Sequence, residues 1–256
     1  MTKAQYLDID DRSEDLRDLT RHNRATPQQF QEKFDLSWLY HDNGLEGIVF
    51  TSQELAQAFD DTQVAADTSV LPILAEIRNH KAAIDFIREE AKAKRLNVTI
   101  GLFRDLYEML GKGLAGRDKA VYRRDMPLHR TYFHDIDQPS KIPAHLDRLV
   151  DYTKSKEFKE SHPIQEAATI QWMFMQVFPY AENSGKIARL LSNLILLRGG
   201  YLPVVIHAID RQRYYETLRQ PVTALRQFLI EAMENSLENA FKFFREAQRS
   251  RTRRAI

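Results

Sequence analysis

The sequence predicts a mostly helical protein, and three observations lead to this fold class. Glycine and proline number only 9 each among 256 residues, so few positions interrupt a helix. Alanine, leucine, glutamate, glutamine and arginine, which all favour helices, are abundant. Apolar residues recur at helical spacing over long stretches. We therefore expect an all-α fold, with one short β-hairpin where the helical pattern is interrupted.

The first half of the chain contains clear helix signals. Thr26-Pro27 is a good N-cap and first-turn pair for a helix from Thr26 to Lys33. Thr51-Ser-Gln-Glu54 is a capping box that predicts the start of the next helix. Amphipathic helices are then expected from Leu74 to Lys94 and from Thr99 to Leu114.

Residues 116–143 interrupt this pattern. They contain Pro127, Pro139 and Pro143, with aromatic and β-branched residues between them. This segment is the one candidate β-hairpin, and the alternative is an irregular connection. Helices resume after it, and we expect them at Ile142–Lys156, Pro163–Val177, Lys186–Leu197, Arg211–Arg219 and Val222–Arg249.

Length, charge and cysteine content set further bounds. The 256 residues fit one helical domain with terminal additions, or two smaller lobes. Lys and Arg number 37 against 36 Asp and Glu, so bulk charge indicates neither nucleic acid nor an anionic membrane as a partner. The absence of cysteine suits a reducing cytoplasm. The polar N-terminus is no signal peptide and no apolar run spans a bilayer, so we expect a cytoplasmic protein.

The C-terminus is first aromatic and then basic. Phe243-Phe244 can pack against the body of the protein or against a second copy in a homodimer. The arginines after it can contact nucleic acid or an acidic partner, or they can form a solvated helix end.

The stretch from Phe178 to Arg189 has the character of a phosphate-binding loop that opens a helix. Asn183 and Gly185 tolerate positive φ, so backbone N–H groups can converge on an anion there. Lys186 and Arg189 lie in the first turn of the expected helix, where cations oppose the helix dipole. This placement is explained if both side chains hold an anion. The alternative is an ordinary helix–loop–helix turn with two solvated cations.

The chain around this loop resembles the Fic (Fido) family. The family signature is H-P-F-x-[DE]-G-N-G-R-x-x-R, and residues 178–189 read FPYAENSGKIAR. A helix beginning with His162-Pro precedes the loop, and one ending in Gly-Gly-Tyr201 follows it. Residues 39–51 resemble the family's inhibitory helix. Further matches are Glu76–His80, Leu106–Leu110 and Tyr122-Arg123.

This resemblance extends from Phe34 to Leu218 and implies a domain organisation. A Fic-like core would cover residues 34–220, with the inhibitory-type helix near 38–47 and a flap near 118–140. An N-terminal helical extension (1–33) would precede it, and a C-terminal helix with the basic tail (221–256) would follow. In the family the flap docks the protein target as an added strand.

The resemblance also implies roles for single residues. Phe178 occupies the position of the family's catalytic His, so we assign no catalytic residue. Glu182 matches the acid that binds Mg²⁺. A nucleotide such as ATP would be held by the positions that match the phosphate loop, namely Asn183, Ser184, Gly185, Lys186 and Arg189. Of these, Gly185 and Arg189 are unchanged from the signature, whereas the other three replace a Gly, an Asn and an Arg.

These departures have chemical consequences. In the family a target hydroxyl attacks the α-phosphate of a nucleotide, and a positioned base typically contributes about 10²–10⁴-fold. Phe178 cannot accept a proton, and Lys186 has the charge of Arg without its two-pronged grip on phosphate. Replacement bases could be His134, His162 or His207, or the phenol of Tyr180. We expect instead that these histidines are surface or capping residues and that Tyr180 is a buried aromatic with a satisfied hydroxyl.

Glu46 matches the inhibitory glutamate, which in the family pairs with the residue matched by Arg189. Asp42 stands where that motif begins with Ser or Thr. The Glu46–Arg189 pair can either join two helices structurally or regulate nucleotide entry, and we favour the structural role.

Three functions remain open. The chain can be a Fic protein without standard AMP transfer that binds a nucleotide in a regulatory or scaffolding role. It can be a transferase whose acceptor, such as an amine or a carboxylate, needs no base. It can also be a protein-interaction module that uses the flap.

Overall fold

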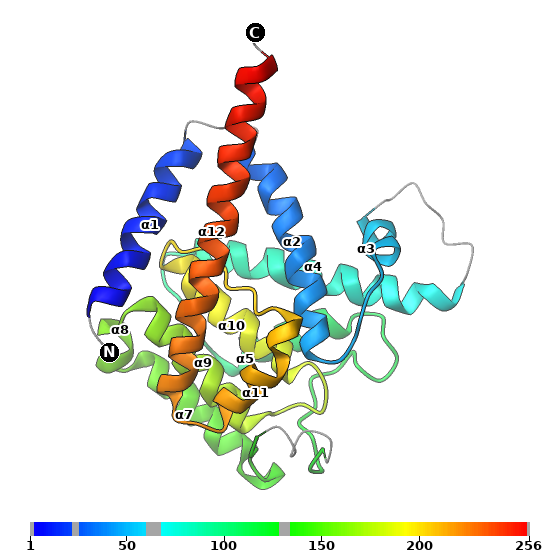
Figure 1. The fold of residues 1–256 in the computed structure, drawn as a ribbon. Helices are drawn as coiled ribbons and strands as arrows, with labels where there is room; N and C mark the ends of the chain where they lie inside the picture. Colours follow the sequence, from blue (N-terminus) through cyan, green and yellow to red (C-terminus); the bar gives the residue numbers. More distant parts are fainter. Residues whose placement is uncertain (1–2, 22–25, 60–67, 128–133, 255–256) are drawn as a thin grey trace.

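The computed structural model describes residues 3–21, 26–59, 68–127 and 134–254. Within these ranges the regular structure is helical and contains no strand, which confirms the all-α fold class (Figure 1). The elements are α1 (Lys3–Arg21), α2 (Thr26–Leu45), α3 (Ser52–Phe59), η1 (Thr68–Val70), α4 (Leu71–Ala91), α5 (Ile100–Gly111), η2 (Pro139–Lys141), α7 (Ile142–Lys154), α8 (Lys156–Glu160), α9 (Pro163–Val177), α10 (Ser184–Arg198), η3 (Ala208–Asp210), α11 (Arg211–Leu218) and α12 (Val222–Arg254).

Helices α9 and α10 form the centre of the molecule (Figure 1). Every residue of α10 from Ser184 to Leu196 is buried, including the charged Lys186 and Arg189. Helix α4 packs against α10, and α12 packs against α9, so this helix pair is covered from two sides. The loop that joins α9 to α10 is thereby held at both ends by the core.

Local sequence explains where these two helices begin and end. The ring Nδ1 of His162 accepts the N–H of Ile164 at 3.2 Å and so caps α9, with proline in the first turn. At the end of α10, Gly200 has φ +82°. The N–H of Gly200 donates to Leu197 and that of Tyr201 donates to Leu196, both at 3.0 Å, which forms a Schellman motif. The sequence predicted both ends.

The N-terminal helices differ from the prediction in extent. The helix predicted at Thr26–Lys33 and the inhibitory-type helix near 38–47 form one continuous helix, α2. The capping box is confirmed, because Glu54 N–H donates to Thr51 Oγ1 at 3.1 Å and Thr51 N–H donates to Glu54 Oε2 at 2.7 Å. Helix α1 packs along α12.

The predicted β-hairpin is not formed by the described residues of its segment. Residues 118–127 and 134–138 contain no strand, and residues 128–133 lie outside the described part. The described residues run beside the α9–α10 loop instead. Arg123 N–H donates to the Pro179 carbonyl and Asp137 N–H to the Gln176 carbonyl, both at 2.9 Å.

The long helix α12 extends past the other helices at its C-terminal end (Figure 1). Phe244 is buried, with its ring centroid 5.1 Å from that of Phe30 on α2, so the predicted packing of this aromatic pair against the body occurs. The side chains of the basic tail, residues 249–256, lie outside the described part. Among the described helices, none combines the length and apolarity needed to cross a membrane.

Candidate functional site

The α9–α10 loop contains two non-glycine residues in the left-handed region. Phe178 has φ 44° and Asn183 has φ 61°. Asn183 agrees with the prediction of a turn residue that tolerates positive φ. For Phe178 this backbone conformation costs on the order of 1–3 kcal/mol and persists because the surrounding structure holds it. Helix α10 begins at Ser184 rather than at the predicted Lys186.

Gly185 is needed because the absence of a side chain lets another residue approach α10 closely, and not because of its backbone freedom. It lies inside α10 without a positive φ. A Cβ at this position would collide with the carboxylate of Glu46 on the turn that follows α2, and would lie 3.0 Å from Nη1 of Arg189. The missing side chain therefore lets Glu46 lie against the start of α10.

Ser184 and Tyr180 stabilise the loop itself. Ser184 Oγ accepts the Tyr180 N–H at 2.9 Å and donates to the Tyr180 carbonyl at 2.8 Å. The Tyr180 side chain is fully buried, as expected, but its hydroxyl has no hydrogen-bond partner in the described part of the chain, contrary to expectation. Burial is the main cause that raises the pKa of Tyr180, and nearby Tyr122 raises it further. The phenol therefore stays protonated and does not act as a base.

Phe178 is buried completely, with 0% exposure. Its carbonyl accepts a hydrogen bond from Nε of Arg123 at 2.7 Å, and Arg123 Nη2 reaches the Val177 carbonyl at 3.2 Å. The buried guanidinium thus neutralises the C-terminal end of α9 and attaches the flap segment to the loop. The base position of the signature therefore faces the core.

Lys186 and Arg117, on either side of the loop, are already paired with carboxylates. Nζ of Lys186 donates to Glu76 Oε1 on α4 at 2.8 Å, and Lys186 is only 2% exposed. Arg117 Nε contacts the carboxylate of Glu182, and Arg117 Nη1 lies 3.7 Å from Glu76. A phosphate that bound these cations would have to compete with two carboxylates of the protein.

A pocket of about 290 Å³ opens at this loop. Three carboxylates and two cations belong to its lining, so the lining carries no excess of positive charge. The residues that line it are Glu46, Ile48, Glu76, Arg117, Pro127, Ala181, Glu182, Asn183 and Lys186. The pocket therefore contains all three predicted elements, namely the acid at 182, the loop and the gating residue Glu46, together with Glu76 and Arg117.

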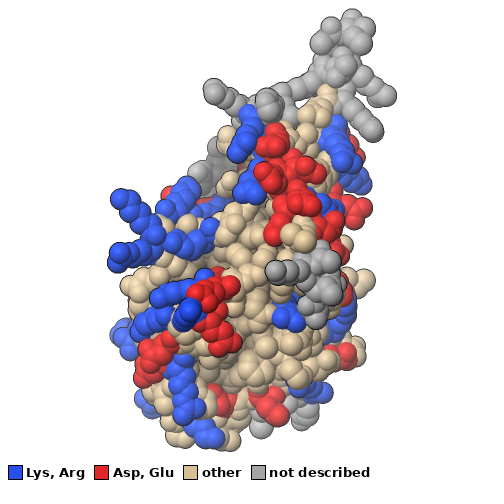
Figure 2. Space-filling model, turned by 90° about the vertical axis from the view of Figure 1, so that its left-hand side faces the viewer, with Lys and Arg blue, Asp and Glu red and all other residues tan. Residues whose placement is uncertain are grey.

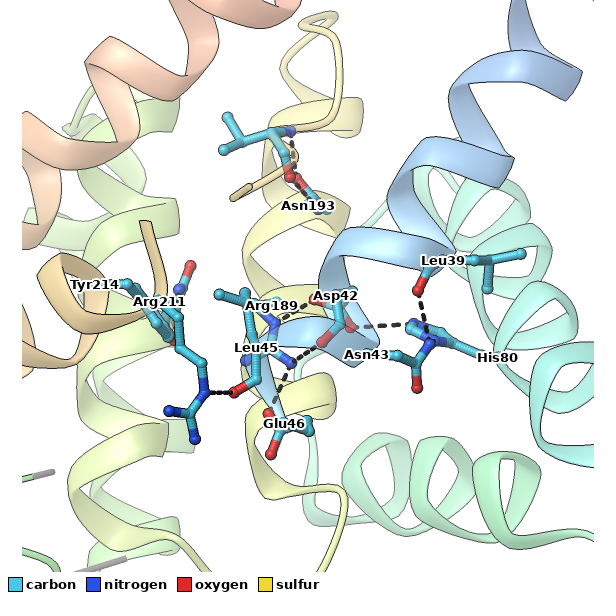
Figure 3. A network of polar contacts seen from close by, with 12 residues as sticks. Leu39, Asp42, Asn43, Leu45, Glu46, His80, Arg189, Asn193, Arg211 and Tyr214 are labelled. Atoms are coloured by element: carbon cyan, nitrogen blue, oxygen red, sulfur yellow. Dashed lines mark hydrogen bonds and ion pairs between the residues drawn. The ribbon is translucent and has the colours of Figure 1, made fainter. Parts of the chain in front are cut away.

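Arg189 lies behind this pocket, held by α2 and the turn that follows it (Figure 3). Its Nη2 donates to Glu46 Oε1 at 2.8 Å, and its Nε contacts the carboxylate of Asp42. These three side chains are at most 6% exposed. Burial alone would lower the pKa of Arg189, but the charges of Asp42 and Glu46 raise it well above its usual value. Burial raises the pKa of Asp42 despite the opposing charge of Arg189.

His80 and Asn43 complete the network on the far side of Asp42 (Figure 3). Asn43 Nδ2 donates to the Leu39 carbonyl at 2.7 Å, which fixes the orientation of its amide. The same nitrogen lies 3.2 Å from His80 Nδ1, so Nδ1 accepts and the ring proton is on Nε2. Nε2 lies 3.2 Å from Asp42 Oδ2. Burial is the main cause that holds the pKa of His80 well below its usual value, and the positive charge of Lys186 lowers it further. The ring is therefore neutral.

The three histidines considered as replacement bases lie elsewhere. None of them lines the loop pocket as the described residues form it. His162 caps α9, and His207 stacks on His41 with ring centroids 4.4 Å apart. His134 is buried and donates through Nε2 to the Met175 carbonyl at 2.9 Å. The capping role expected for His162 is confirmed, whereas the expectation of a surface or capping residue is wrong for His134, which packs in the interior.

Glu182 is the one predicted metal ligand, and its side chain is 50% exposed. No group of three or more His, Asp or Glu side chains that could hold a metal ion occurs in the ranges that the structure describes. A cation at Glu182 would therefore need oxygens from a bound phosphate and water, which is the usual way in which Mg²⁺ is held beside nucleotides.

Comparison with known proteins identifies the domain. Residues 94–196 match the Fic/DOC family. The chain carries a Fic/DOC domain. It is 26% identical over 182 residues to a protein adenylyltransferase Fic of Nematostella vectensis, which covers 71% of this chain and 42% of the relative. It is 23% identical over 221 residues to one of Drosophila virilis, which covers 86% of this chain and 44% of the relative. The alignments thus span less than half of these relatives.

Solved structures support the Fic fold. A Fic-domain signaling protein of Bacteroides thetaiotaomicron superposes with a TM-score of 0.80 at 23% identity, covering 94% of this chain and 98% of the other. Fic-1 (residues 134–508) of C. elegans gives 0.75 at 20% identity, covering 94% and 71%. Asp42, Glu46 and Glu76 lie outside the matched segment 94–196, although their carboxylates contact Lys186 or Arg189 in the first two turns of α10.

Sequence reasoning did not find the roles of Glu76 and Arg117. Glu76–His80 matches the family, but no local pattern links Glu76 to Lys186, 110 residues later. Arg117 stands at the start of the segment 116–143, where the helical pattern is interrupted. The Lys186–Glu76 contact depends on the packing of α4 against α10, and the Arg117–Glu182 contact depends on where the segment after α5 lies.

Proposed function

We propose that this Fic protein binds a phosphorylated nucleotide at the α9–α10 loop and acts in regulation or binding, without the standard transfer of AMP. The observation that carries the proposal is Phe178. It occupies the base position of the signature and is fully buried. A side chain without a titratable group, facing the core, cannot deprotonate a target hydroxyl.

Nucleotide binding is supported by the chemistry of the loop pocket. Lys186 and Arg117 line the pocket beside the N-terminus of α10, which also favours anions. The curated relatives are named protein adenylyltransferases, so an adenine nucleotide is the first ligand to test. Glu182 would hold the Mg²⁺ that accompanies the phosphates, and the cation would supply further charge neutralisation.

The cations of the loop pocket are neutralised by protein carboxylates. Glu76 forms an ion pair with Lys186, and Glu182 forms one with Arg117. Glu46 stands at the start of α10 and shares Arg189 with Asp42. We propose that a bound phosphate displaces the carboxylates of Glu46 and Glu76 from their cations. Both residues would then control whether a ligand binds at the loop.

A second candidate is transfer to an acceptor that needs no base. Half of the Glu182 side chain is accessible, and Lys186 lines the same pocket, so a nucleotide–metal complex could still be positioned. An amine or carboxylate acceptor would then attack without a protein base. Detection of a labelled small-molecule product would favour this candidate over the first.

Calorimetry with ATP, GTP, UTP and CDP-containing ligands, each with and without Mg²⁺, tests the binding proposal. At about 100 times its dissociation constant, a ligand should stabilise the fold by roughly 2.7 kcal/mol, which a thermal melt also detects. Lys186→Ala should abolish the signal. Lys92→Ala, which removes a lysine that is 70% exposed at the C-cap of α4, is the matched control and should not change it. Absence of binding by all four ligands would overturn the proposal.

A further inference from the structure

We propose a second ligand site, separate from the Fic loop, which takes an organic monocarboxylate with an apolar body. It is a cavity of about 350 Å³ between α1, α2, α12 and the turn after α10. This volume falls in the range of small-molecule sites, which begin at about 300 Å³. The cavity, here called the α1–α2–α12 pocket, has no lining residue in common with the loop pocket among the described residues.

The walls of the pocket are predominantly apolar. Each of the surrounding segments contributes apolar side chains that would contact the aliphatic or aromatic part of a ligand. These side chains are Leu16, Phe30, Phe34, Leu197, Leu202, Leu237 and Phe244. Apolar surface that remains facing a cavity is available for a ligand to cover, at about 25 cal/mol per Å². The lining therefore explains affinity for an apolar body but not for any head group.

Ser13 is the polar anomaly in this wall. The residue is only 4% exposed, and its Oγ has no hydrogen-bond partner among the described residues. A buried hydroxyl without a partner costs about 1–3 kcal/mol. Ser13 lines the pocket, so a ligand oxygen inside the pocket would supply the missing partner.

The charged residues of the lining indicate the sign of the ligand. They are Arg17, Arg21 and Arg88, and no carboxylate lines the pocket in the described residues. Arg21 is paired with Asp18, and Arg88 donates to Asp35 at 2.8 Å, so these two charges are balanced. Arg17 forms no ion pair within the described ranges, and its Nη1 lies 3.4 Å from where a Cβ of Gly200 would be. One unbalanced positive charge at the rim fits a monoanion.

Acidic side chains gather on the face of the molecule that α1 covers (Figure 2). They are solvent-exposed, so their field is screened over about 8–10 Å at ordinary ionic strength. The exposed acids of α1 are Asp8, Asp11, Glu14, Asp15 and Asp18. None of them belongs to the pocket lining. The lining positions Ser13, Leu16, Arg17 and Thr20 recur at helical spacing on another face of α1.

Titration of the full chain with sodium decanoate, followed by calorimetry, tests this site. We expect one equivalent to bind saturably, whereas 1-decanol and acetate at the same concentrations bind far more weakly. Arg17→Glu should weaken decanoate about tenfold by reversing the rim charge. Arg12→Glu is the matched control, because Arg12 lies on the same helix outside the pocket lining, and it should bind decanoate like the wild type.

Ser13→Leu provides an independent arm. A leucine here fills the cavity with apolar atoms and removes the unpartnered hydroxyl, so it should raise the melting temperature and abolish decanoate binding. If Ser13→Leu does not fold, the Arg17→Glu and Arg12→Glu pair decides the question. The proposal is wrong if decanoate does not saturate, if decanol binds equally well, or if the two charge reversals have the same effect.

Discussion

Asp42 and Arg189 form an ion pair in which each side chain is only 4% exposed, and this pair joins α2 to the second turn of α10. Glu46 adds a second carboxylate to the same guanidinium at 2.8 Å. One buried cation therefore has two anionic partners. Asp42 is enclosed by Arg189 and His80, whereas Glu46 lines the loop pocket. The two carboxylates should differ in what their removal costs.

Asp42→Ala should destabilise the fold by about 3 kcal/mol, because breaking a buried ion pair typically costs 3–5 kcal/mol and Glu46 compensates in part. Glu46→Ala should cost less than about 1 kcal/mol, since Arg189 retains Asp42 and the local excess of negative charge disappears. Urea unfolding of both variants measures the difference. Equal losses would show that Glu46 is as structural as Asp42.

Gly185→Ala should be coupled to Glu46. A Cβ at Gly185 meets the Glu46 carboxylate, so the substitution should destabilise the wild type by about 1–3 kcal/mol. In a Glu46→Ala background it should be close to neutral, because alanine is the better helix former by up to about 1 kcal/mol. A double-mutant cycle measures this coupling. Additive effects would mean that Glu46 does not lie against Gly185 in solution.

Arg123→Ala should destabilise the protein by about 2–3 kcal/mol, because hydrogen bonds to charged groups contribute roughly 1.5–3 kcal/mol and the carbonyls of Val177 and Phe178 would lose their donor. The exposed neighbour Arg124 offers a matched control, and Arg124→Ala should stay within about 0.5 kcal/mol of the wild type. Chemical denaturation of the two variants checks this. A similar small effect in both would rule out Arg123 as the attachment of the flap segment.

His80 should make the fold sensitive to acid. Its pKa is lowered in the folded state by burial, so the unfolded chain binds a proton there first as the pH falls below about 6.5. The contribution to stability is therefore fully present above pH 6.5 and is lost as the pH falls towards the folded pKa. His80→Gln should lessen this loss by up to about 1.4 kcal/mol per pH unit. Parallel melts from pH 7.5 to 4.5 test it, and identical slopes would contradict it.

Much of the fold could be predicted from the sequence because its signals are local. The ends of α9 follow from His162-Pro and from the residues of the loop, and the end of α10 follows from Gly199-Gly200. The full extent of α2 could not be predicted from local signals. The segment between Lys33 and residue 38 carries no strong signal, and the continuation of the helix depends on the burial of Trp38 and Leu39 in the core.

The site could be predicted only in part. Residues of the loop were identified by their order in the signature, which is local. The contacts that neutralise it are not local, because Lys186 meets a residue 110 positions away and Arg189 meets one 147 positions away. That Gly185 serves close approach rather than a turn, and that Phe178 faces the core, likewise depends on tertiary packing.

The most direct test of the central claim is incubation of the purified chain with ATP labelled at the α-phosphate, Mg²⁺ and a cell lysate. We predict no label on the wild-type protein or on any lysate protein, although ATP binds. Phe178→His combined with Glu46→Gly, which places a base at the signature position and removes the carboxylate above Gly185, is the variant in which label could appear. Label transferred by the wild type and lost in Glu182→Ala would contradict the account.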